Sequence, residues 1–139
     1  MDSKKFILAV VVGYVLLAAL GYLIHGIWLQ PVYKEYDFLW RAQDWMMKKR
    51  WVMWVGQLLF TVIFAYIYTR GVENKPWIGQ GIRFGVMMTL LAVVPVACTE
   101  YTVHPIPYTL AVKWMIAGGL QLTVLGLVVA WFLKKPSTA

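Results

Sequence analysis

Four long apolar stretches, separated by short polar segments, dominate the chain. They cover about residues 6–29, 51–69, 78–102 and 108–133, and each contains at most two charged residues. A helix needs about 20 apolar residues to cross a bilayer, because the hydrocarbon layer is about 30 Å thick and each residue adds about 1.5 Å. Backbone polar groups inside hydrocarbon must be satisfied within the segment itself. Each stretch therefore predicts a membrane-spanning helix.

The three connections between these stretches differ in character. Residues 30–50 interleave aromatic and charged side chains, which is typical of a segment lying among lipid head groups, and residues 37–49 predict a short amphipathic helix there. Residues 70–77 predict a tight polar turn, and the proline-rich residues 103–107 predict a stiff, extended corner. None of the connections is long enough for a second domain. We therefore expect residues 1–139 to form one antiparallel four-helix transmembrane bundle, with an interfacial segment between its first two helices.

The composition narrows the class of protein. Hydrophobic residues make up 61% of the chain and charged residues 14%, and the mean hydropathy is +0.67. A water-soluble domain of this size could not bury so many apolar side chains. The single cysteine, Cys98, excludes an internal disulfide. We therefore expect an all-α integral membrane protein whose first partner is the lipid bilayer.

The net charge of +7 comes from basic residues that lie mostly at the ends of the predicted helices. They are Lys4, Lys5, Lys48, Lys49, Arg50, Arg70, Lys75, Arg83, Lys134 and Lys135. Basic side chains at such positions meet anionic lipid head groups, which favours a membrane surface over nucleic acid as the partner. Tryptophans also mark the helix ends, as in the aromatic belts of membrane proteins, at Trp28, Trp51, Trp54, Trp77 and Trp131.

The orientation depends on how lysine and arginine are distributed between the two sides. With the N-terminus inside, the cytoplasmic side carries seven basic residues and the other side six. The first helix usually dominates this choice, and Lys4 and Lys5 directly precede its apolar run. That run is too long for the core of a signal peptide and predicts a retained anchor. We therefore expect both termini in the cytoplasm.

Polar residues at mid-membrane depth are few. None of the six acidic residues lies there, which argues against proton-coupled transport. The uncharged polar residues at this depth are Gln57, Thr61, Thr89, Gln121 and Thr123. We expect them to form hydrogen bonds between helices, as is common in bundles. The alternative is a small-molecule transporter whose path is lined by Gln57, Thr61, Thr89 and Gln121.

The candidate chemistry lies near one end of the predicted bundle, where His25, Glu100 and His104 are expected to meet. Glu100 and His104 are four residues apart and share a helix face if the third helix continues to His104. Two imidazoles and a carboxylate form a possible transition-metal site, and either histidine could ligate a heme or chlorophyll. The simpler interpretation is structural, with Glu100 paired to His104 or Lys113. We predict no catalytic residue.

Small residues indicate where helices approach closely. Tyr14, Ala18, Gly21, His25 and Trp28 follow a 4-3-4-3 spacing along the first helix. Gly81 and Gly85 open the third helix, and Gly118, Gly119 and Gly126 thin the fourth. Association in lipid depends on such close packing. Pro95 predicts a kink in the third helix.

A resemblance can be stated from five short motifs that occur in order along the chain. They are Gly21-Tyr22-Leu23-Ile24-His25-Gly26, Gly56-Gln57-Leu58-Leu59-Phe60, Gly81-Ile82-Arg83-Phe84-Gly85, Pro105-Ile106-Pro107, and Trp114 with Gly118-Gly119. The chain resembles a widespread group of bacterial four-helix inner-membrane proteins of unknown function. The resemblance implies a four-span fold in the bacterial inner membrane and supplies no activity.

These observations favour a non-enzymatic protein that acts through intramembrane packing. We expect an accessory or structural subunit of a larger membrane complex, or a homo-oligomer, because little of the chain lies outside the predicted spans. Two alternatives stay open. One is a protein that binds a metal or cofactor through His25, Glu100 and His104, and the other is a small-molecule transporter.

Overall fold

The computed structural model describes residues 2–135, and most of them are helical. In chain order the elements are α1 (Ser3–Gly21), the π-helix η1 (Tyr22–Trp28), α2 (Gln30–Glu35), the 3-10 turn η2 (Asp37–Leu39), α3 (Gln43–Gly71), α4 (Trp77–Met88), the π-helix η3 (Thr89–Val93), α5 (Val94–Val103) and α6 (Tyr108–Leu133). No strand occurs within the described residues. The all-α prediction is confirmed.

Four continuous helical segments are long and apolar enough to cross a membrane. They are Ser3–Trp28, Gln43–Gly71, Trp77–Val103 and Tyr108–Leu133. All four predicted stretches are therefore confirmed as helices. The clearest difference in bounds is at the second segment, where the predicted stretch begins at residue 51 but α3 begins at Gln43.

The predicted amphipathic helix at residues 37–49 does not form as a separate unit. Asp37–Leu39 makes a single 3-10 turn, and the backbone at Trp40 is extended. From Gln43 the chain enters α3 and continues without interruption to Gly71, because no proline stops it. The connection is helical in a different place, at α2, which has a proline in its first turn.

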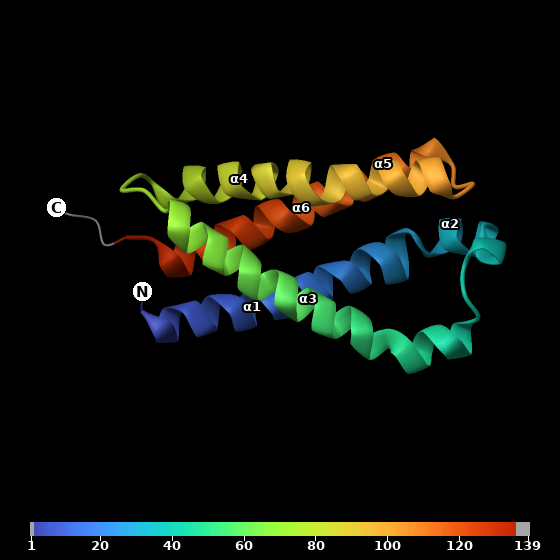
Figure 1. The fold of residues 1–139 in the computed structure, drawn as a ribbon, viewed down its shortest axis with the longest axis horizontal. Helices are drawn as coiled ribbons and strands as arrows, with labels where there is room; N and C mark the ends of the chain where they lie inside the picture. The colour runs from blue at the N-terminus through green and yellow to red at the C-terminus, as the bar shows by residue number, and fades with distance from the viewer. Residues whose placement is uncertain (1, 136–139) are drawn as a thin grey trace.

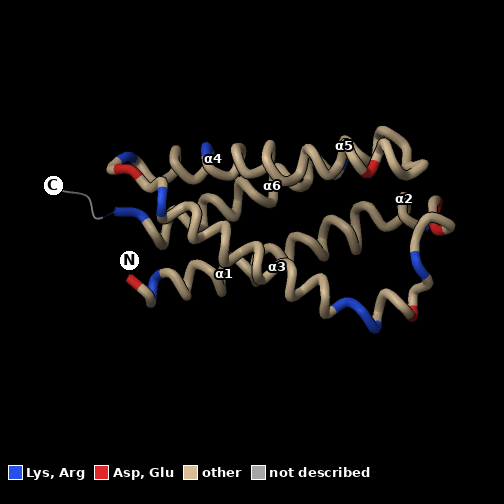
Figure 2. The backbone as a smooth tube through the Cα atoms, in the orientation of Figure 1, with Lys and Arg blue, Asp and Glu red and all other residues tan. Residues whose placement is uncertain are grey.

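Figure 1 shows how the segments are arranged in space. The start of α1 and the end of α6 lie at one end of the molecule, together with the loop between α3 and α4. At the opposite end lie α2 and the turn between α5 and α6. Lysine, arginine, aspartate and glutamate gather toward these two ends, and the stretch between them is almost uncharged (Figure 2).

The buried side chains form two clusters. The larger one joins α1, α3, α4 and α6, and its buried members are Val10, Leu17, Phe64, Ala65, Tyr68, Met88, Leu122, Leu125, Val129 and Ala130. The smaller one holds the segment around α2 against α6, through Ile24, Leu29, Ile106, Leu110, Ala111 and Ala117. The second cluster fixes the connection that carries the candidate site described below.

Glycines bring the backbones of α4 and α6 into direct contact. A Cβ atom added at Gly126 would lie 2.3 Å from the Gly81 carbonyl oxygen, and one added at Gly85 would lie 2.5 Å from the Leu122 carbonyl oxygen. Neither neighbour can move aside as a flexible side chain could, because both are main-chain atoms. The predicted close approach at these glycines is confirmed.

A π-helical segment, η3, lies directly before Pro95, where the sequence predicts a kink. The π-helix η3 ends at Val93, and Pro95 follows in the first turn of α5. Proline has no N–H to donate, and its ring crowds the carbonyl group four residues earlier. The wider π turn accommodates both effects, so the helical segment continues from α4 into α5.

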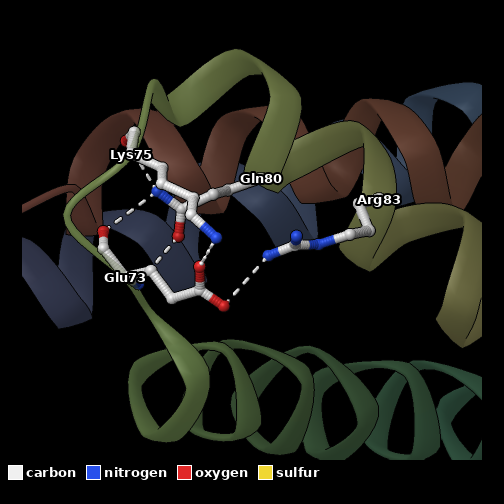
Figure 3. A network of polar contacts seen from close by, with 4 residues as sticks. All are labelled: Glu73, Lys75, Gln80 and Arg83. Atoms are coloured by element: carbon white, nitrogen blue, oxygen red, sulfur yellow. Dashed lines mark hydrogen bonds and ion pairs between the residues drawn. The ribbon is translucent and has the colours of Figure 1, made fainter.

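The loop between α3 and α4 is held by the buried side chain of Gln80. Its Oε1 accepts a hydrogen bond from the Glu73 N–H at 2.8 Å, and its Nε2 donates to the carbonyl oxygens of Glu73 at 3.0 Å and Lys75 at 2.7 Å (Figure 3). The Glu73 carboxylate forms ion pairs with Lys75 and, at 3.4 Å, with Arg83. The hydrogen bond and charge of Lys75, together with Arg83, lower the pKa of Glu73.

Candidate functional site

A cavity of about 780 Å³ opens at the end of the molecule where α2 lies. Four parts of the chain line it: the end of η1, the segment from α2 to the start of α3, the first turns of α3, and α6. The lining residues are His25, Gly26, Gln30, Tyr33, Lys34, Asp37, Trp40, Arg41, Ala42, Gln43, Met46, Met53 and Trp114. Its volume lies within the range of roughly 300–1,000 Å³ that is typical of ligand pockets.

The cavity exists because α1 and α3 separate toward this end. The two helices touch near Gly13, where an added Cβ would lie 3.4 Å from the Thr61 methyl carbon. Beyond this contact the first half of α3 runs away from α1, as Figure 1 shows. Every residue from Gln43 to Gly56 is exposed, so this half of α3 is not covered by the rest of the described chain.

Tyr33 is the centre of the polar wall of the cavity. Its hydroxyl oxygen accepts a hydrogen bond from the indole N–H of Trp114 at 2.8 Å and lies 2.6 Å from Nδ1 of His25. Its backbone carbonyl accepts a hydrogen bond from the indole N–H of Trp40 at 3.1 Å. The His25 and Tyr33 rings are stacked with an interplanar angle of 9°. Side chains from η1, α2, the following loop and α6 therefore hold one another in fixed positions.

The hydrogen-bonding groups of Trp114, Tyr33 and His25 determine which group donates in each bond. An indole N–H can only donate, so Trp114 donates to the Tyr33 hydroxyl, whose own proton is then free to go to Nδ1 of His25. Neutral His25 then carries its proton on Nε2. Burial raises the pKa of Tyr33, and the hydrogen bond from Trp114 partly offsets that shift. The phenol is therefore protonated at neutral pH and can act as the donor.

The position of His25 depends on an irregular stretch of helix. Tyr22–Trp28 is π-helical, which adds a residue to the turn and changes which side chains face the same way. Isolated π turns within α-helices are frequent at functional sites. Here the π turn directly precedes Gln30 and α2, and α2 folds back so that Tyr33 reaches His25.

Three charged side chains, which we call the rim, line the cavity: Lys34, Asp37 and Arg41. Within residues 2–135 none of them forms an ion pair. The Arg41 guanidinium lies 4.1 Å from the centre of the Trp45 ring, a cation–π contact that holds it in place. Met46 and Met53 provide an apolar wall on the α3 side. The cavity therefore combines a polar rim of net positive charge with apolar side chains from α3.

The three predicted metal ligands are not brought together. The helix ends at Val103, and the extended backbone of His104 still leaves its Nδ1 2.9 Å from Oε2 of Glu100. His25 does not join them, because it bonds Tyr33 instead. The part of the chain that the structure describes holds no group of three or more His, Cys, Asp or Glu side chains that could bind a metal ion. The physical reason is the fold of α2, which supplies the partner of His25 from its own short helix.

Thr61 and Thr89 do not form the predicted polar contacts between helices. The Thr61 hydroxyl donates to the Gln57 carbonyl oxygen at 2.7 Å, and the Thr89 hydroxyl donates to the Gly85 carbonyl oxygen at 2.8 Å. Both are bonds to the preceding turn of the same helix, which any helical threonine can make. The side-chain amides of Gln57 and Gln121 make no hydrogen bond to any residue between 2 and 135.

Sequence reasoning missed the role of Tyr33, Trp40 and Trp114. Tyr33 and Trp40 belong to the aromatic and charged segment that was interpreted as interfacial, and nothing in the sequence distinguishes them from the other rings there. Trp114 lies 81 residues beyond Tyr33, so only the fold brings them together. A signal for the site would have been a tyrosine two residues after Pro31, since the Gln30–Pro31 step opens the short helix α2 that carries Tyr33.

The fold and site define an all-helical protein with four apolar helices of membrane-spanning length and an aromatic, positively charged cavity at one end. No family model matches the chain, and no curated protein or solved structure matches it either. Its function must therefore be argued from the site itself.

Removing the Tyr33 hydroxyl tests whether this wall is a fixed unit. Tyr33→Phe leaves the Trp114 N–H and the Nδ1 of His25 without their partner, so we expect a loss of stability of about 1–3 kcal/mol. Thermal unfolding in detergent, followed by tryptophan fluorescence, measures it. Tyr101→Phe, at a half-exposed residue of α5, is the matched control and should leave Tm unchanged. Equal Tm values for both variants would show that the wall does not contribute to stability.

Proposed function

We propose that this chain is an integral protein of the bacterial inner membrane, with four antiparallel spans and both termini in the cytoplasm. The near absence of charge between the two ends of the molecule supports insertion (Figure 2). The two lysines before α1 support the orientation. In this orientation the cavity lies toward the periplasmic leaflet.

We propose further that the protein works through its intramembrane surface, as an accessory subunit of a larger membrane complex or as a homo-oligomer. The observation that carries this proposal is the uncovered first half of α3. The second half of α3 buries Thr61, Phe64, Ala65 and Tyr68, whereas no residue from Gln43 to Gly56 is buried. Helices associate in lipid by packing against one another, so a span left uncovered over half its length is available to another helix.

The side of α3 that faces away from the cavity is the surface that we assign to this contact. Trp51, Val55 and Leu59 are four residues apart, lie on one helix face and are all more than half exposed. Met46 and Met53, which line the cavity, lie on the other side of the helix. A partner helix can therefore pack on α3 without entering the cavity.

Cysteine cross-linking in intact membranes tests this assignment. In a Cys98→Ser background, Val55→Cys should give a defined adduct with a thiol-reactive cross-linker, either a dimer or a species containing one further subunit. Leu91→Cys in the same background is the control, because Leu91 is 69% exposed but lies on η3, away from α3. Mild detergent extraction should then yield an assembly larger than the 16.0 kDa monomer.

Two results would contradict the proposal. One is equal cross-linking at residues 55 and 91, which would indicate random collision in the bilayer. The other is a monodisperse monomer after mild extraction, with no adduct at either residue.

A further inference from the structure

The cavity has the features of a ligand-binding site, and it lies on the opposite side of α3 from the proposed docking surface. It is preformed, because the hydrogen bonds of Tyr33 fix residues from η1, α2 and α6 around it. Ligand sites are usually concave and mostly apolar, with a few fixed polar groups that orient the ligand. Here the polar group held in place is the His25 ring, through its bond to Tyr33, and Gln30 and Gln43 add further polar side chains to the lining.

The net positive charge of the rim favours a negatively charged ligand. Lys34 and Arg41 contribute two positive charges and Asp37 one negative charge, and none of the three is neutralised by a partner among the described residues. Three further basic residues, Lys48, Lys49 and Arg50, follow in the first two turns of α3. An anion at the rim is therefore attracted, and a phosphate offers the acceptor oxygens that arginine and lysine bind.

The apolar side chains on the α3 side of the cavity favour a ligand that also has an apolar part. Met46 and Met53 line the α3 wall, and both are flexible, polarisable side chains that adapt to irregular apolar surfaces. The next turn on this face carries Gln57, whose side-chain amide has no hydrogen-bond partner in residues 2–135.

We infer that this cavity binds an anionic phospholipid of the surrounding bilayer, with its phosphate between Lys34 and Arg41 and its acyl chains along Met53. The inference goes beyond the proposed docking of another helix, because it concerns the opposite side of α3. The positions of these residues along the chain agree with it, because Lys34 and Arg41 lie in the charged connection and Met53 lies in the apolar stretch that begins at residue 51. A bilayer lipid can enter from the side, between α1 and α3.

Native mass spectrometry of the detergent-solubilised full chain tests this inference, with phosphatidylglycerol and phosphatidylcholine as probes. We expect the first lipid adduct to form at lower concentration with phosphatidylglycerol. Lys34→Gln/Arg41→Gln should weaken phosphatidylglycerol binding about tenfold, because each basic residue near an anionic head group contributes measurably to the affinity. Lys4→Gln/Lys5→Gln removes the same charge at the other end of the molecule and should retain the wild-type affinity.

A steric pair of variants tests the apolar part of the site. Met53→Trp should fill the cavity beside α3 and reduce binding of both lipids, whereas Met87→Trp, on the exposed face of α4, should not. Retained folding of each variant is checked by its far-UV circular dichroism. The measurement follows lipid adducts on the monomer, so its outcome is independent of the cross-linking at residue 55.

Three results would overturn the inference. Equal affinity for the two lipids would remove the role of the rim charges. Equal weakening by both double variants would show that net charge, rather than the cavity, determines binding. Displacement of phosphatidylglycerol by equimolar glycerol 3-phosphate would show that the site takes a soluble phosphate and not a lipid.

Discussion

Gly126→Ala is expected to reduce the stability of the protein by about 1–3 kcal/mol or more, the usual cost of overpacking. The added Cβ would lie 2.3 Å from the Gly81 carbonyl oxygen and 3.1 Å from the Gly85 nitrogen. These are backbone atoms of α4, so the two helices must move apart, and the close packing between them is lost over its whole length. Unfolding in mixed detergent micelles, followed by circular dichroism, measures the effect.

The control for this experiment is Gly56→Ala on α3. No atom lies within 4 Å of a Cβ added there, and the residue lies inside a helix. Alanine should therefore be neutral or stabilise the helix by about 0.5–1 kcal/mol, because glycine is the more flexible residue in the unfolded chain. The two substitutions are chemically identical and are predicted to act in opposite directions. A Gly126→Ala variant as stable as the wild type would mean that α4 and α6 do not touch at this glycine.

Gln80→Leu is expected to reduce stability by a similar amount, about 2–4 kcal/mol. Leucine is similar in size but leaves the N–H and carbonyl of Glu73 and the carbonyl of Lys75 without their partner. Each unsatisfied backbone group costs about 1–3 kcal/mol when it is kept from water, and less where water reaches the loop. Limited proteolysis of the loop between α3 and α4, together with the unfolding midpoint, measures the loss.

Arg83→Gln provides the comparison for Gln80→Leu. It removes only the ion pair with Glu73, which contributes little to stability because solvent screens both exposed side chains. A larger effect from Arg83→Gln than from Gln80→Leu would show that charge, rather than the buried amide, holds the loop.

The helices of this protein could be predicted from the sequence, because length and hydropathy alone determine which segments can cross a bilayer. The glycine contacts between α4 and α6 could also be anticipated, since Gly81 and Gly85 are four residues apart on one face. The start of α3 could not, because the charged residues before Trp51 suit a separate interfacial helix as well as the first turns of a longer one.

The candidate site was harder to predict than the fold. The sequence places His25 near the correct end, but it does not show that α2 folds back and gives the imidazole to Tyr33. Nor does it show that α3 diverges from α1 and leaves space between them. Both features depend on the path of residues 29–42, where short helical turns alternate with extended backbone and no periodic pattern indicates the direction of the chain.

The placement of the first and last helices has a practical consequence. Because α1 begins and α6 ends at the far end of the molecule from α2 and the cavity (Figure 1), a fluorescent reporter or affinity handle attached beside either of these helix ends stays clear of the cavity. Two different fluorophores, one at each end, would then report the spacing of α1 and α6 by energy transfer while the opposite end is occupied or empty.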